Sequence, residues 1–199
     1  MDMNEVEKKA YLSYHQDGLL DIGLGILVLS WAGAIMFDMG VLPAIMAASG
    51  VSVYFAAKQI VTVPRMGLVK FGQERQKRIR KEKRYFTLFF TATALLGMLF
   101  FLAWTMLPTE ELMKIKDLPL VVIGLLGALL MAAVAYWKQL RRFYIYAGVM
   151  AVSFIGGPFY DIGRAEYFLI PGVLILAGGI AQLIMFLRKY PIAKEKHNE

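Results

Sequence analysis

The chain has 199 residues, of which 58% are hydrophobic and 19% are charged, with a mean hydropathy of +0.55 and a net charge of +7. Soluble domains carry roughly 25% charged and 45–50% apolar residues, so this composition excludes a disordered chain, a collagen and an ordinary soluble enzyme, and it indicates a membrane protein. Because there are no cysteines, disulfide frameworks, zinc–thiolate sites and iron–sulfur clusters are excluded as well.

Six uninterrupted apolar stretches divide the chain, and we expect each of them to be a transmembrane helix. A helix needs about 20 apolar residues to cross a hydrocarbon core of ~30 Å. Continuous rather than alternating apolar residues favour helices over the strands of a membrane barrel. The stretches cover residues 19–37, 41–57, 85–107, 118–136, 143–159 and 167–187. The predicted fold is therefore an all-α polytopic membrane bundle with six transmembrane helices.

The first span opens with a group of polar side chains. It follows a cytoplasmic amphipathic segment, 1–18, and begins the first transmembrane hairpin, 19–57. Asp17 and Asp21 are four residues apart and share one face of a helix, and Asp21 is the only charged residue inside the six spans. We interpret His15, Asp17, Asp21 and Arg65 as a candidate polar cluster, in which Arg65 is the expected partner of Asp21.

Two interpretations of this cluster stay open. An ionisable side chain inside a membrane span is a functional-site hypothesis, because it can bind a cation, carry a proton or pair with a basic residue. Alternatively, carboxylates at a helix N-terminus cap the helix and are stabilised by its dipole. The chain has two histidines, one of them in the tail, so we expect no metal site and no cofactor.

The loop between the second and third spans, 58–84, is the most basic part of the chain. Residues 73–84 lack helix breakers and predict a basic cytoplasmic helix that runs directly into the third span. Ten lysines and arginines in this loop exceed what orientation alone requires, and each one near an anionic leaflet contributes about 1 kcal/mol. We expect contacts with anionic lipid headgroups from Lys70, Arg75, Lys77, Arg78, Arg80, Lys81, Lys83 and Arg84.

The rest of the chain predicts a second hairpin at 85–136, a short cytoplasmic loop at 137–142, a third hairpin at 143–187 and a cytoplasmic tail at 188–199. Near the end of the fifth span, the run of Gly156, Gly157 and Pro158 is either a broken helix whose carbonyls face an ion or a simple helix stop. Small residues at intervals of four, as at 124, 128 and 132, indicate close packing between helices.

The distribution of positive charge predicts the orientation of the chain. Nineteen of the 22 lysines and arginines lie on one side of the six spans. Loops on the cytoplasmic side of a membrane carry an excess of these residues. Both termini and the basic loop are therefore expected in the cytoplasm. This arrangement of the charge also replaces nucleic acid binding as the explanation of the net charge.

Two motifs carry a resemblance to a known group of proteins. DGLLDIGLG at residues 17–25 and VPRMGLVKF at residues 63–71 resemble segments of uncharacterised prokaryotic six-span integral membrane proteins. The resemblance covers about the first third of the chain. It implies a multi-pass protein of the prokaryotic cytoplasmic membrane and implies no particular activity or functional residue.

Three functions agree with these features. The first is a non-enzymatic membrane protein that acts through contacts with anionic lipid, or with a protein partner or a second copy of itself. The second is a small transporter or the substrate-binding subunit of one. The third is a lipid-modifying enzyme at the Asp17 and Asp21 face. The zinc motif H-E-x-x-H, the nucleophile elbow G-x-S-x-G and a Walker A loop are all missing, so no catalytic residue is assigned and the first function is preferred.

Overall fold

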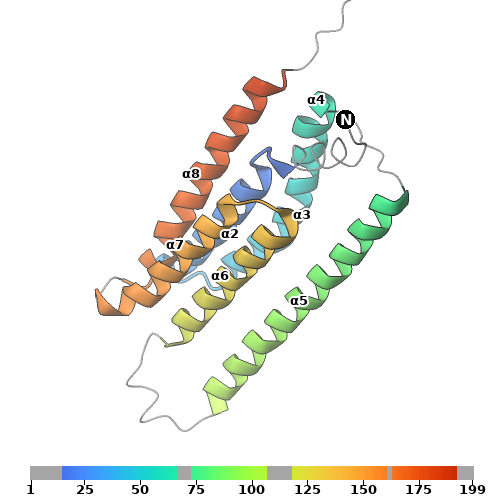
Figure 1. Cartoon of the computed structure of the whole chain (residues 1–199). Coiled ribbons are helices and arrows are strands. Elements are labelled where there is room, and N and C mark those ends of the chain that lie inside the picture. The colour runs from blue at the N-terminus through green and yellow to red at the C-terminus, as the bar shows by residue number, and fades with distance from the viewer. Residues whose placement is uncertain (1–14, 67–72, 107–117, 161–162, 192–199) are drawn as a thin grey trace, which may run out of the picture. The chain divides into compact units, whose positions relative to one another are not determined.

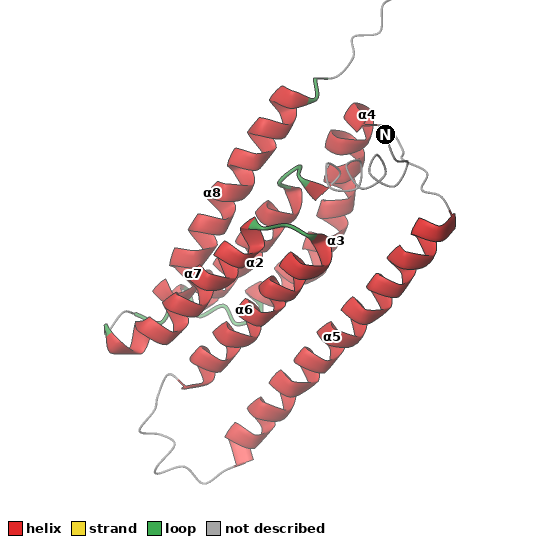
Figure 2. Ribbon diagram, viewed as in Figure 1, coloured by secondary structure: helices red, strands yellow, loops and turns green. Residues whose placement is uncertain are grey.

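The computed structural model describes residues 15–66, 73–106, 118–160 and 163–191 (Figure 1). Helices and short connecting turns account for these residues, and no strand occurs among them (Figure 2). The all-α class predicted from the sequence is confirmed.

Among the described residues, four helices are long and apolar enough to cross a membrane. The first is α2, Leu19–Met36, and the second is the continuous helix Leu42–Met66. The other two are α6, Leu118–Lys138, and α8, Glu166–Lys189. These four helices agree with four of the six expected spans and support the prediction of a membrane protein.

The second of these helices extends beyond its predicted end. It consists of α3, Leu42–Ala57, a π-helical turn η1, Lys58–Thr62, and the short α4, Val63–Met66. The sequence predicts that the span ends at 57 and that Lys58 begins the basic loop. The helix itself continues past Lys58, which is buried within the fold, to Met66.

The two other expected spans lie in helices of different lengths. The first is part of α5, Gln73–Met106, a single helix of 34 residues. It starts with the basic segment, as predicted, and includes the apolar stretch Thr87–Leu99. The second is α7, Arg142–Gly156, whose 15 residues are followed by the 3₁₀ turn η3, Gly157–Phe159. Fifteen helical residues advance about 22 Å, which is less than the thickness of a typical hydrocarbon core.

The chain divides into two compact units. Unit 1 contains Met1–Phe71 and Gly172–Glu199, and unit 2 contains Gly72–Pro171. Helix α8 therefore contributes its first residues to unit 2 and the remainder to unit 1.

In unit 1, glycines bring the backbones of α2 and α8 close together. A Cβ atom at Gly25 would lie 2.7 Å from the backbone nitrogen of Leu176, and one at Gly179 would lie 2.7 Å from that of Ile22. Gly172 in turn faces the side chain of Leu29. The residue numbers rise along α2 as they fall along α8, so the two helices are antiparallel. Close approach at small residues is the usual way in which helices associate in a bilayer.

In unit 2, large side chains fill the spaces that glycines leave. Gly124 of α6 lies against the ring of Phe154 of α7, where no Cβ atom would fit. The Phe154 ring also packs edge-to-face on Phe168, with ring centroids 4.7 Å apart. On the other side of α6, Phe89 of α5 packs on Trp137 with centroids 5.2 Å apart. These contacts hold α5, α6 and α7 in sequence along unit 2.

The Gly156-Gly157-Pro158 run ends α7 compactly. The backbone N–H of Tyr160 donates to the carbonyls of Gly156 and Gly157, at 3.2 and 3.3 Å. Gly157 itself is buried against the ring of Tyr167. Because these carbonyls accept a hydrogen bond within the turn, the geometry supports the helix-stop interpretation of this run.

Two glycines of α2 offer a matched pair for testing the α2–α8 contact. Gly25→Ala should destabilise the protein by about 1–3 kcal/mol, because the added methyl meets backbone atoms that cannot move independently. Gly23→Ala should leave stability unchanged or raise it slightly, since nothing lies within 4 Å of its added methyl. Thermal unfolding in detergent measures both. Equal melting temperatures for the two variants would contradict close α2–α8 packing.

Candidate functional site

Asp17 lies immediately before α2 and starts that helix. Gly18 follows with φ 75°, a left-handed conformation that glycine adopts without steric cost. The backbone N–H of Leu19 then donates to Oδ1 of Asp17, at 3.2 Å. A Cβ atom at Gly18 would also lie 2.8 Å from the backbone nitrogen of Leu183. Gly18 therefore provides both the turn and the space against α8 that place the Asp17 carboxylate.

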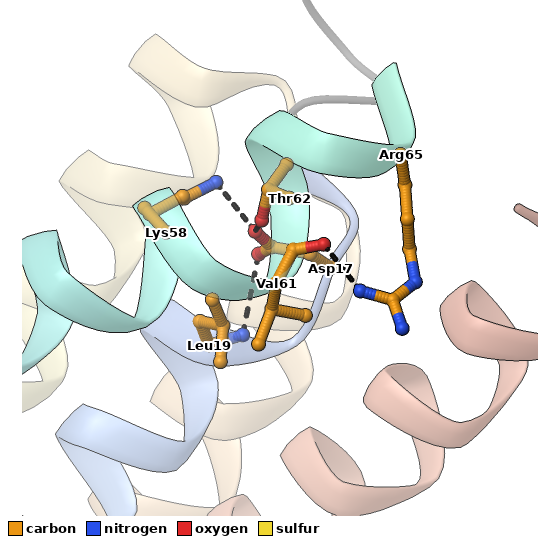
Figure 3. Close-up of polar contacts among 6 residues, drawn as sticks. All are labelled: Asp17, Leu19, Lys58, Val61, Thr62 and Arg65. Atoms are coloured by element: carbon orange, nitrogen blue, oxygen red, sulfur yellow. Dashed lines mark hydrogen bonds and ion pairs between the residues drawn. The ribbon is translucent and has the colours of Figure 1, made fainter. Parts of the chain in front are cut away.

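The other oxygen of Asp17 receives two side chains from the π-helical turn. Lys58 Nζ lies 2.6 Å from Oδ2, and Thr62 Oγ1 donates to the same oxygen at 2.5 Å (Figure 3). Asp17 and Thr62 are fully buried, and the Lys58 side chain is only 4% exposed. The carboxylate thus binds Lys58 and Thr62 from η1 and the N–H of Leu19 from the start of α2. We call the side chains of Asp17, Lys58 and Thr62 the Asp17 cluster.

The π-helical turn that carries Lys58 and Thr62 lies directly before a proline. In this turn the N–H of Val63 donates to the carbonyl of Lys58, five residues earlier. Pro64 has no N–H, and its ring would clash with the carbonyl four residues back in a regular α-helix. A wider turn relieves that clash. π-Helical turns inside α-helices are rare and occur frequently at functional sites.

The Asp17 cluster joins opposite charges away from water. Removing two charges from water is costly, and the loss is recovered only when the ions are paired with good geometry and their remaining valences are hydrogen-bonded. The cluster meets both conditions through Thr62 and Leu19. Its chemistry is that of a neutralising ion pair that ties the start of α2 to the end of the second long helix.

The structure places the four residues of the predicted polar cluster in different environments. Asp17 is the centre of the observed cluster, and His15 is half-buried two residues before it. Asp21 is fully buried one turn into α2, beside Gly179 of α8. The predicted Asp21–Arg65 pair stays a prediction. Arg65 Nη1 donates to the carbonyl of Val61, one turn back on its own helix, at 2.7 Å (Figure 3).

Sequence reasoning missed Lys58 and Thr62. The sequence places both residues in the basic loop 58–84. In such a loop Lys58 contributes only to the positive charge, and Thr62 has no predicted contact. A signal was present in their spacing, since residues four apart share a helical face if the helix continues. The apolar residues that follow, Ile60, Val61 and Val63, are consistent with such a continuation.

The predicted lipid contacts are described in part. Arg80, Lys81 and Arg84 are exposed on α5. Lys70 and the side chains of Arg75, Lys77, Arg78 and Lys83 lie outside the described residues. Within the described residues, no group of three or more histidines, cysteines and carboxylates is arranged to hold a metal ion.

Comparison with known proteins identifies no matching family model, no similar curated protein and no similar solved structure. Through the Asp17 cluster, the segment 17–25 binds Lys58 and Thr62, which lie just before the segment 63–71.

A double-mutant cycle tests the energetic role of the Asp17 cluster. Lys58→Met should destabilise the protein by about 3–5 kcal/mol, because it leaves a buried carboxylate without its counter-ion. Adding Asp17→Asn should recover much of that loss, since the buried charge is then removed as well. Thermal and denaturant unfolding in detergent measure these effects.

The control for this cycle is Asp38→Asn, which removes an exposed carboxylate from the turn after α2. It should change stability by less than about 0.5 kcal/mol. If Lys58→Met were as mild as this control, the ion pair would not contribute to folding.

Proposed function

We propose that this chain is a six-span integral membrane protein of the prokaryotic cytoplasmic membrane, with both termini in the cytoplasm. It acts without catalysis, through contacts between its basic surface and anionic lipid headgroups. Four helices of sufficient length and hydropathy support the membrane location. The apolar part of α5 and the segment α7–η3 are the two further spans.

The observation that carries the proposal is the continuity of α5. Its basic first turns and its apolar turns belong to one helix, Gln73–Met106, without a break. Arg80 and Arg84 are four residues apart on one face and Lys81 is beside them, and all three are exposed. A rigid helix that enters the bilayer at Tyr85 holds these charges at the level of the headgroups. Positive charge at that height is attracted to anionic lipids, and an aromatic ring at the boundary is typical of a membrane interface.

The proposed fifth crossing is short but feasible. Helix α7 and the turn η3 together cover 142–159. A bilayer accommodates a short span by local thinning, at a modest cost for each ångström of mismatch. Arg141 and Arg142 at the start of α7 and Arg188 and Lys189 at the end of α8 would then lie on the cytoplasmic side, as the positive-inside rule requires.

The Asp17 cluster supports a role in contacts rather than in catalysis. Lys58 and Thr62 both bind Asp17, and the carboxylate also accepts the N–H of Leu19. A general base or nucleophile must instead present an atom to a substrate. The polar groups of the Asp17 cluster are therefore used within the protein.

Lipid binding by the full-length protein tests the role of α5. Native mass spectrometry of the protein after delipidation, incubated with equal amounts of phosphatidylglycerol and phosphatidylcholine, should show preferential retention of the anionic lipid. The triple variant Arg80→Gln, Lys81→Gln, Arg84→Gln should weaken that binding by on the order of 100-fold, given about 1 kcal/mol for each charge.

The matched control removes three other exposed basic side chains, Arg141→Gln, Arg188→Gln and Lys189→Gln. Its net charge is the same as that of the α5 variant, so general electrostatic attraction changes equally. Equal losses in the two variants, or equal retention of the two lipids by the native chain, would contradict a specific role of α5.

The orientation has its own test, which the lack of cysteines makes direct. A single cysteine at Lys81 should react with a membrane-impermeant maleimide only in inside-out vesicles. A single cysteine at Arg164, between α7 and α8, should react only in right-side-out cells. Labelling of both positions from the same side would contradict the six-span topology.

A transport function is the second candidate, and one observation favours it. Ionisable side chains buried in a membrane helix often mark a pathway for ions or protons. Asp21 in α2, Asp17 just before it and Lys58 in η1 are all buried. The same native mass spectra separate the two functions. A tightly retained small polar molecule, absent from lipid-only controls, would favour transport over lipid contact.

A further inference from the structure

The two ends of the π-helical turn bind the same atom. Lys58 is the first residue of η1 and Thr62 is the last, and both contact Oδ2 of Asp17 (Figure 3). They are also the two buried residues of the turn. Between them, Gln59 and Ile60 are exposed. The turn is therefore held to the rest of unit 1 at its ends.

The π-helical winding favours this double contact. In an α-helix, residues four apart are separated by about 6 Å along the axis. A π-helical turn is wider and contains more residues, so the same two residues are closer along the axis. The Lys58 and Thr62 side chains can then reach one carboxylate oxygen together. The contact with Asp17 thus stabilises the π-helical winding over the α-helical one.

A second cause of the same winding lies next to it. Pro64 cannot donate to the carbonyl four residues earlier, and a wide turn before it avoids the clash of its ring. Pro64 by itself does not determine the π-helical winding, however, because proline also occurs in α-helices that are only kinked. What distinguishes this turn is the buried anion that binds both of its ends.

The winding of η1 determines the direction of the residues that follow it. The hydrogen-bonded ring of a π-helical turn contains one residue more than the ring of an α-helical turn. Rewinding it to an α-helix therefore rotates the following segment, α4, by about 100° relative to α3. The half-buried Arg65 and Met66 would then present a different face to unit 1.

We propose that the Asp17 cluster is a conformational latch. While Asp17 binds Lys58 and Thr62, the turn stays π-helical and α4 keeps its present rotation. When the Asp17 carboxylate is removed, the turn rewinds and α4 rotates. The latch is independent of the proposed contacts with lipid, because it involves Asp17, η1 and α4 of unit 1 and none of the basic residues of α5.

Distances between spin labels measure this rotation in the full-length protein. The chain has no cysteine, so label pairs can be introduced without other substitutions. The reporting pair is Ile26→Cys on α2 with Met66→Cys on α4, beyond the turn. The reference pair is Ile26→Cys with Val53→Cys on α3, before the turn. Ile26 and Val53 are exposed, so their labels disturb little.

Asp17→Ala should shift the reporting distance by about 5 Å, because side-chain atoms lie about 5 Å from a helix axis and turn with it. The reference distance should not change. Thr62→Val keeps the ion pair and removes one hydrogen bond. A sample of this variant should therefore show the native and the shifted distance of the reporting pair together. This milder variant decides the question if Asp17→Ala does not insert into the membrane.

Two controls complete the experiment. Ser49→Ala removes a hydroxyl that donates to the carbonyl of Ile45 within α3, and it should leave both distances as they are. Pro64→Ala keeps the latch and should retain the native reporting distance. The proposal is overturned if the variants of Asp17 and Thr62 that fold keep the native distance, if Ser49→Ala shifts it as well, or if Pro64→Ala alone produces the shift.

Discussion

Asp17 brings a carboxylate into a part of unit 1 that water does not reach, and the arrangement of the first hairpin follows from the need to compensate it. A buried carboxylate is tolerated when a counter-ion and hydrogen-bond donors surround it. Lys58, Thr62 and the N–H of Leu19 supply them. In the structure the second long helix continues past Thr62, is π-helical from Lys58 to Thr62, and brings this turn beside the start of α2.

The start of α2, where it contacts α8, requires glycine. Gly18 adopts a left-handed conformation between Asp17 and Leu19 and also lies against the backbone of α8. Gly25 and Gly179 continue this close approach along α2 and α8. In a bilayer there is little hydrophobic force between helices, so close packing of this kind stabilises their association. The position of the charge and the packing of the helices therefore depend on one short motif, residues 17–25.

The basic residues of the chain have two different roles. Lys58 is buried and balances a single carboxylate. Arg80, Lys81 and Arg84 are exposed on the helix that leads into the apolar part of α5. In the proposed function the first group stabilises the protein and the second group meets the lipid. Composition and charge totals do not separate these roles, because a lysine contributes the same charge in either place.

The sequence by itself determined the helical class, the apolar stretches and the continuity of the basic segment with the third one. These properties are local, since they depend on hydropathy over about 20 residues and on the absence of helix breakers. Asp17 and Asp21 are unusual in the sequence for the same reason. The continuation of the second helix past Lys58 to Met66 is not a local property, because a lysine after an apolar stretch normally indicates the membrane surface.

Only the tertiary structure decided which partner each charge has. Asp17 and Lys58 are 41 positions apart in the chain, and nothing in their local patterns connects them. Arg65 was the expected partner of a buried carboxylate, yet it bonds to Val61 on its own helix. Pairing at this separation depends on how a hairpin packs and where a helix widens, and those features follow from contacts between segments rather than from the periodicity of any one of them.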